Sequence, residues 1–155
     1  MTFDFAQQLA KGEAAERLLD EYFADRFEIL PVTREGQRKG IDRVFIDRQT
    51  HTHESVEYKT DWRAQNTGNA FIETVSVDSQ EKRGWAYTTQ ADLVFYYVPG
   101  EELVYVLQPV VIRERLPKWQ QRYRAAKARN EGYYTHGVLV PLDELERCAR
   151  EVISL

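Results

Sequence analysis

Apolar residues recur at two different spacings along this chain, and the spacing divides it into helical and extended segments. Over residues 5–27 they follow the stripe of an amphipathic helix, and no proline interrupts it. Runs rich in β-branched and aromatic residues predict strands further along. These strands span residues 27–32, 41–47, 54–60, 70–77, 92–98, 103–107 and 137–140.

Helical patterns return toward the C-terminus. We expect helices over residues 109–116 and 117–130, and a last helix that begins at Pro141, because proline is favoured in the first turn of a helix. The order is one helix, several strands, two helices, and then a strand and a helix. This order predicts an α/β fold in which helices flank a central mixed β-sheet.

The composition is that of an ordinary globular protein. Of the 155 residues, 43% are hydrophobic and 30% are charged, so we expect a single domain over residues 1–155. We place its core at about 5–107 and a partly basic C-terminal region at 109–155. No apolar run approaches the roughly 20 residues that span a membrane, and no secretory signal is visible. The one cysteine, Cys148, fits a reducing compartment, so we expect a cytoplasmic protein.

Three charged residues stand among the apolar residues of the best strands. Glu57 and Lys59 are separated by Tyr58, so both point to one face of their strand. In a hairpin with the preceding strand, Asp42 lies opposite either Lys59 or Glu57, depending on the register. Either register brings the three charged residues to one spot, at the end of the hairpin away from the turn.

Such a cluster has a chemical use. Two carboxylates a few ångström apart repel each other, and a divalent cation relieves this repulsion. Asp42 and Glu57 would hold Mg²⁺, which needs only one or two carboxylates, with the backbone carbonyl of Tyr58 as a third ligand. Lys59 would then position the attacking water or offset charge on phosphorus. The alternative is structural: Asp42 caps a turn after Gly40, and Glu57 and Lys59 form a solvated ion pair.

The segments Gly40-Ile41-Asp42 and Glu57-Tyr58-Lys59 resemble the signature of the PD-(D/E)XK nuclease superfamily, which has the restriction-endonuclease-like fold. That signature is an aspartate at the start of one strand and (D/E)-x-K on the adjacent strand. Ile41 stands where the family has a proline. The resemblance implies a metal-dependent endodeoxyribonuclease with Mg²⁺ as cofactor, for which Mn²⁺ can substitute, and with Asp42, Glu57 and Lys59 as catalytic residues.

Two further segments are similar to nucleases. KGEAAERLL resembles the first-helix segment of archaeal Holliday junction resolvases and related phage nucleases, which implies that Glu16 reaches the metal site, with Glu13 as the other candidate. FIETVS resembles the strand after the motif in small phage nuclease-like proteins, which implies that Glu73 orients Lys59 or a metal-bound water. An exposed helix carboxylate and an edge-strand carboxylate are the alternatives. The similarity to resolvases also implies a homodimer that acts on branched DNA.

The net charge of −4 means that any contact with DNA has to come from a local basic patch. Residues 113–129 hold seven basic residues and one acid, a net charge of +6 against −10 for the remainder. A basic helical stripe suits a phosphate backbone, and a solvated surface helix is the alternative. The basic loop before Asp42 is a second candidate. The predicted DNA-binding residues are Arg38, Lys39, Lys118, Arg122, Arg124, Lys127 and Arg129.

These patterns together favour a Mg²⁺-dependent DNA endonuclease. A site-specific endonuclease of the restriction or homing type would show the same residues. A non-catalytic DNA- or protein-binding module on the same fold is a further alternative, and metal binding without cleavage would favour it.

Overall fold

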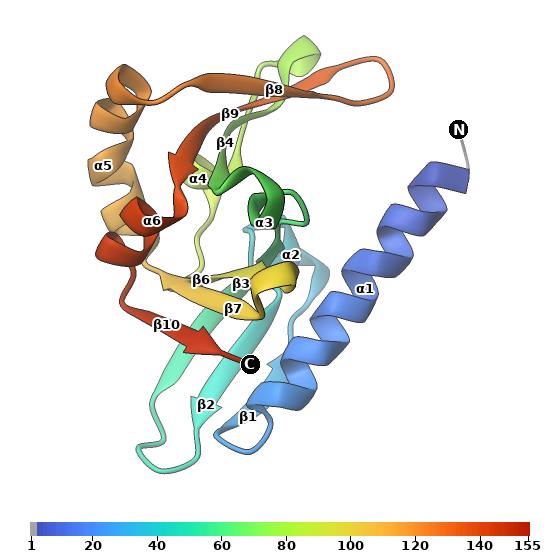
Figure 1. Cartoon of the computed structure of the whole chain (residues 1–155). Coiled ribbons are helices and arrows are strands. Elements are labelled where there is room, and N and C mark those ends of the chain that lie inside the picture. Colours follow the sequence, from blue (N-terminus) through green and yellow to red (C-terminus); the bar gives the residue numbers. More distant parts are fainter. Residues whose placement is uncertain (1–2) are drawn as a thin grey trace.

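The computed structural model describes residues 3–155, with side chains from residue 6 onward, and contains two β-sheets (Figure 1). The larger sheet has six strands in the order β1-β2-β3-β6-β7-β10. Neighbouring strands are antiparallel, except that β3 and β6 are parallel. The predicted central mixed sheet is therefore confirmed. Its strands are β1 (Phe27–Pro31), β2 (Arg43–Asp47), β3 (His53–Thr60), β6 (Leu93–Val98), β7 (Leu103–Leu107) and β10 (Glu151–Ser154).

The second sheet has four antiparallel strands in the order β5-β4-β9-β8. The predicted strand 70–77 is present as β4, but it belongs to this sheet because it pairs with β9, with Ile72 opposite Val138. The C-terminal region thus enters both sheets, through β9 and β10. The strands of the second sheet are β4 (Asn69–Val77), β5 (Lys82–Arg83), β8 (Ala125–Arg129) and β9 (Tyr134–Pro141).

Helices flank the six-stranded sheet on both sides, as predicted. The long helix α1 (Phe3–Phe23) lies on one side, and α5 (Pro109–Arg122) and α6 (Leu142–Cys148) lie on the other (Figure 1). Three short α-helices lie between strands: α2 (Arg34–Arg38), α3 (Ala64–Thr67) and α4 (Trp85–Thr88). Two single 3₁₀ turns, η1 (Asp78–Gln80) and η2 (Pro99–Glu101), also lie between strands. Among the described residues, no helix combines the length and apolar character needed to cross a membrane.

Each face of the six-stranded sheet has its own hydrophobic core. β6 contributes alternate residues to the two cores and is buried along its whole length, as a parallel strand covered on both faces should be. On the α1 side, Leu19 shares a core with Val56 and Tyr58 of β3. Because strand residues alternate between faces, Glu57 and Lys59 point to the side away from α1.

Two expectations for the region after β7 were wrong. The predicted helices 109–116 and 117–130 form one helix, α5, which continues through Pro117 and ends at Arg122. Proline removes one hydrogen bond from the helix, but Leu116 and Trp119 are buried on either side and hold it in place. The following residues form β8 instead of a helix. Their sequence AAKAR favours a helix locally, and pairing with β9 overrides that preference.

Two other segments contain structure that the sequence pattern did not predict. The loop 33–40 contains α2, which begins where the hydroxyl of Thr33 accepts a hydrogen bond from the Gly36 N–H at 3.3 Å. The last helix, which follows Pro141, ends at Cys148 and is succeeded by β10, an edge strand that pairs with β7.

Candidate active site

Asp42 lies just before β2 and is held against β3 by two hydrogen bonds. Its backbone N–H donates to the carbonyl of Val56 at 2.9 Å, and its Oδ2 accepts from the backbone N–H of Tyr58 at 2.8 Å. Arg43 is opposite Val56 in the last pair of the β2–β3 ladder, and Asp42, one residue earlier, also donates to Val56 and has no paired residue of its own on β3. Of the two predicted registers, the strands have the one that would bring Asp42 level with Glu57 if the ladder continued, and the register that sets Asp42 opposite Lys59 is wrong.

Glu57 is the buried carboxylate of the site. The residue is 6% exposed, and its Oε1 lies 3.1 Å from the Nζ of Lys59. Its other oxygen, Oε2, is buried and forms no hydrogen bond with any of the described residues. A buried carboxylate oxygen without a partner is destabilising. The lone pairs of Oε2 are therefore free to bind a cation or to accept a hydrogen bond.

Gly40 forms the wall beside this oxygen. Its φ is +79°, a left-handed conformation that favours glycine. A Cβ at this position would lie 3.2 Å from Oε2 of Glu57 and 2.9 Å from Oγ1 of Thr89. Thr89 also donates its hydroxyl to the Gly40 carbonyl at 3.2 Å. The glycine therefore allows the loop that leads to Asp42 to pack directly on the Glu57 carboxylate.

Glu73 approaches the same pair of residues from β4. Its Oε1 accepts a hydrogen bond from the backbone N–H of Trp85 at 3.3 Å. Burial raises the pKa of Glu73, the Lys59 ammonium and the Trp85 N–H oppose this rise, and Glu57 adds to it. Glu73 thus lies within electrostatic range of both Glu57 and Lys59. Its predicted role, to orient Lys59 or a metal-bound water, stays a prediction.

Glu16 approaches Asp42 from α1. Burial raises the pKa of Glu16, Asp42 raises it further, and Arg43 opposes the rise. The Nη2 of Arg43 is 3.5 Å from Oε1 of Glu16, and its Nη1 donates to the carbonyl of Asp42 at 2.9 Å. Glu13 is exposed, and among the charged neighbours that shift the pKa of Glu16 it has the smallest effect. Of the two predicted helix carboxylates, Glu16 is the one placed beside Asp42.

The sequence patterns missed two polar residues in this part of the molecule. Arg43 donates to both carboxylate oxygens of Asp20, at 3.1 Å from Nε to Oδ1 and 3.1 Å from Nη2 to Oδ2. The hydroxyl of Tyr58 donates to Oδ1 of Asp20 at 2.8 Å. This network holds Arg43 beside Asp42. The available signal was the spacing of Asp20, one helical turn after Glu16 on the same face of the helix.

The four predicted catalytic residues occupy both faces of the six-stranded sheet. Glu57 and Lys59 point away from α1, Glu16 belongs to α1, and Asp42 stands between them at the start of β2. Among the described residues, no three or more His, Cys, Asp or Glu side chains are grouped as a metal site. Asp42, Glu57 and the Tyr58 carbonyl, which points to the same side of β3 as the Tyr58 N–H, would be a smaller oxygen donor set. Two carboxylates and a carbonyl are the kind of ligands that Mg²⁺ takes from a protein, because most of its ligands are water.

The short helix α2 leads into this site, and two predicted DNA-binding residues lie at its end, Arg38 as its last residue and Lys39 just after it. Arg38 and Lys39 are both exposed, and the Lys39 Nζ is 3.6 Å from Oε1 of Glu35. An exposed pair of this kind is weak and can exchange its partner. Because Gly40 packs on Glu57, these cations stand one and two residues from the wall of the site.

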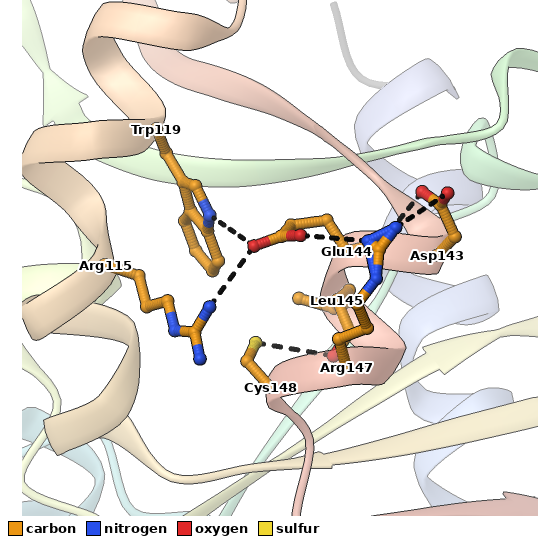
Figure 2. Close-up of polar contacts among 7 residues, drawn as sticks. All are labelled: Arg115, Trp119, Asp143, Glu144, Leu145, Arg147 and Cys148. Carbon is orange, nitrogen blue, oxygen red and sulfur yellow. Dashed lines mark hydrogen bonds and ion pairs between the residues drawn. The ribbon is translucent and has the colours of Figure 1, made fainter.

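On α5, part of the predicted basic patch is used within the protein (Figure 2). Oε1 of Glu144 accepts from Arg115 at 3.4 Å and from the Trp119 indole N–H at 3.3 Å. Oε2 of the same residue accepts from Arg147 at 3.2 Å. Glu144 is therefore a largely buried carboxylate whose two oxygens both have partners, and it joins α5 to α6.

Five predicted DNA-binding residues of the C-terminal region stay exposed, but they do not form one helical stripe. Lys118 and Arg122 lie on α5, where they line a groove of about 400 Å³ together with Trp119 and Tyr123. The other three follow the helix, as Arg124 just before β8 and as Lys127 and Arg129 on it. The predicted stripe is thus split between a helix and an edge strand, because residues 125–129 pair with β9.

Comparisons with known proteins add no relative. No family model matches the chain, and no curated protein or solved structure matches it.

Proposed function

We propose that this protein is a metal-dependent endonuclease that hydrolyses phosphodiester bonds in DNA. The observation that carries the proposal is the buried carboxylate of Glu57, which is next to Tyr58, the residue whose N–H binds the carboxylate of Asp42. Glu57 is paired with Lys59 through one oxygen and keeps the other free of partners among the described residues. A solvated structural ion pair would expose both groups. Instead Glu57 is 6% exposed and the Lys59 side chain 34%.

Each residue of the site then has a role. Asp42, Glu57 and the carbonyl of Tyr58 would hold Mg²⁺ or Mn²⁺. When bound, such an ion polarises a phosphate and makes its bound water a better nucleophile. Lys59 would orient the attacking water or offset the negative charge that develops on the phosphate oxygens. Glu16 would act from the α1 side by its effect on Asp42.

Glu73 would position Lys59 as the second of two carboxylates near its ammonium group. The Oε1 of Glu57 holds this group from its own strand, and Glu73 attracts it from the second sheet. Two anionic neighbours restrict the lysine side chain more than one does, and a restricted lysine is a better-placed catalyst.

The order of elements supports a restriction-endonuclease-like fold of the PD-(D/E)XK type. Asp42 precedes β2, and Glu57 and Lys59 lie on the adjacent strand β3, as the resemblance implies. α1 comes before these strands, and β6 follows them in parallel to β3. One departure is that the strand after the motif, β4, lies in the second sheet.

The similarity of the first helix to junction resolvases further implies branched DNA as the substrate and a homodimer as the active form. Two exposed basic surfaces would bind its phosphates, one on α2 and one on α5 and β8. Sedimentation of the protein with and without a four-way junction tests the dimer.

The activity is tested with a labelled four-way junction, a linear duplex and a single strand, each in Mg²⁺, Mn²⁺ or EDTA. We expect cleavage that needs the metal and falls by about 100-fold or more in Asp42→Asn and in Lys59→Ala, the loss typical of removing one electrostatic contact to the transition state. The matched control is Asp143→Asn, which changes an exposed aspartate on α6.

Asp143→Asn should cut at the wild-type rate. If Asp42→Asn or Lys59→Ala also cuts at that rate, the site does not perform the reaction. Metal binding without cleavage of any of the three substrates would instead indicate a binding module on this fold.

A further inference from the structure

Trp62 is the one exposed indole among the three tryptophans of the chain. It is 43% exposed, whereas Trp85 and Trp119 are 6% and 2% exposed. Tryptophan is highly buried on average, because its large apolar surface gains most from leaving water. A single exposed apolar residue needs no explanation by itself, but Trp62 is also held on a rigid support and lies beside a basic residue.

The turn that carries Trp62 is fixed by Asp61. Oδ1 of Asp61 accepts from the backbone N–H groups of Arg63 at 3.0 Å and Ala64 at 2.9 Å. Oδ2 accepts from the Phe71 N–H at 3.1 Å and from the hydroxyl of the buried Tyr96.

Asp61 also donates its backbone N–H to the carbonyl of Tyr97 at 2.9 Å. The backbone on both sides of Trp62 is thus tied to α3, β4 and β6. The indole is exposed on a rigid support, a condition that lowers the entropy lost when a ligand binds to it.

Trp62 is also close in sequence to the candidate active site. It follows Lys59 by three residues, just beyond the end of β3. The Nζ of Lys11 is 5.6 Å from the centroid of the indole ring. Trp62 therefore lies beside α1, the helix that also carries Glu16. Around Lys11, residues 6–11 and 13–14 of α1 are exposed. Trp62 and Lys11 thus form one exposed aromatic and basic surface just beyond the strand that carries Lys59.

We infer that Trp62 is a stacking surface for an unpaired nucleobase of the substrate, and that Lys11 binds the phosphate next to that base. This inference rests on the proposed function and names its substrate class. Aromatic side chains stack on any base without reading sequence, and they bind single strands in combination with basic residues. In a duplex each base is already stacked and paired, so it must first leave the helix. The substrate is therefore DNA with at least one unpaired nucleotide beside the cut, such as a single strand, a flap or a branch point.

Because only one of the three tryptophans is exposed, tryptophan fluorescence gives a direct test. Wild-type protein in EDTA, where no metal supports cleavage, is titrated with oligothymidylate and with a duplex of the same length. Because the other two indoles are buried, a base that stacks on Trp62 should quench the fluorescence of this exposed indole. The duplex should not quench it. Anisotropy of labelled DNA then measures the affinities of the variants.

Trp62→Ala should weaken binding of the single strand by about 10-fold, as expected for the loss of one base–aromatic contact, and leave duplex binding unchanged. Trp62→Phe should keep most of the affinity, because phenylalanine retains a ring. Lys11→Ala should lower the slope of log affinity against log salt by about 0.7, the contribution of one phosphate on a single strand. The matched control is Tyr22→Ala, an aromatic residue with 44% exposure near the other end of α1, which should bind as the wild type does.

Failure of this inference differs from failure of the proposed function. If the wild type does not bind the single strand, or if Trp62→Ala binds it as tightly as the wild type, the inference is wrong even when Lys59→Ala abolishes cleavage. If the single strand binds through Trp62 and no DNA is cut in Mg²⁺ or Mn²⁺, the stacking surface stands and the nuclease proposal falls.

Discussion

The carboxylate of Asp42 lies 2.8 Å from the backbone nitrogen of Tyr58 and accepts its hydrogen. Tyr58 is the residue between Glu57 and Lys59, so this hydrogen bond holds Asp42 against the peptide that joins them. The pairing of Glu57 with Lys59 at 3.1 Å completes the group. Changes in any of these residues should therefore have effects that a solvated ion pair would not produce.

Mg²⁺ should stabilise the wild-type protein against unfolding by urea. A ligand that binds only the folded state raises the free energy of unfolding, by about 2.7 kcal/mol at roughly 100 times its Kd. Glu57→Gln removes one of the two proposed charged ligands, so its unfolding midpoint should be nearly the same in Mg²⁺ and in EDTA. Circular dichroism in a urea series measures both midpoints.

The control for this experiment is Glu144→Gln. Glu144 is also largely buried, but both of its oxygens have partners within the protein. The variant should be less stable than the wild type and should keep the full shift on addition of Mg²⁺. Equal shifts in the wild type and in Glu57→Gln would exclude Glu57 as a ligand.

Gly40→Ala should destabilise the protein more than Gly68→Ala. Both glycines have positive φ, +79° and +73°, so both variants bear the strain of a left-handed backbone, about 1–2 kcal/mol. At Gly40 the new Cβ would also press on Thr89 and Glu57, whereas at Gly68 it would meet no described atom within 4 Å. Urea unfolding of both variants gives the difference, and equal losses would contradict the close packing of Gly40 on the site.

Glu73→Gln should gain stability relative to the wild type as the pH rises. The pKa of Glu73 is raised above its ordinary value of 4.5, mainly by burial. A raised pKa means that the contribution of Glu73 to stability is fully present below the unfolded-state pKa and is lost as the pH rises through the folded-state pKa. Glutamine stays neutral and keeps an oxygen for the Trp85 N–H.

The measurement for Glu73→Gln is the difference in unfolding free energy from the wild type at about pH 4 and about pH 7. We expect the variant to be relatively more stable at the higher pH. A difference that does not change with pH would show that the folded protein leaves the pKa of Glu73 at its ordinary value.

Removing basic residues from α5 or α2 should lower the salt dependence of DNA binding. Each phosphate contact on a duplex contributes about 0.9 to the slope of log affinity against log salt. The double variants Lys118→Ala/Arg122→Ala and Arg38→Ala/Lys39→Ala should each lower it by about 1.8 if both residues touch phosphate. Anisotropy over a salt series shows which surface the duplex crosses.

Arg147→Ala is the matched control, because this arginine is paired with Asp143 and Glu144 on its own helix. It should leave the salt slope unchanged. An unchanged slope in both double variants would remove α5 and α2 from the DNA-binding surface.

Local sequence patterns determined the features that depend only on residues close together in the chain. The alternation around Tyr58 placed Glu57 and Lys59 on one face, and the apolar run 92–98 predicted a strand, which is β6. These features depend on the period of the side chains and on burial, both of which can be read from a few consecutive residues.

Tertiary structure decided everything that depends on residues far apart in sequence. The pairing of Arg43 with Val56 selected one of two registers, and β9 drew both β4 and residues 125–129 into a second sheet. Packing of α1 on the face opposite Glu57 separated that carboxylate from Glu16. The distribution of side chains within each segment cannot show which distant partner buries the most apolar surface or satisfies the most backbone hydrogen bonds, and those terms determine the pairing.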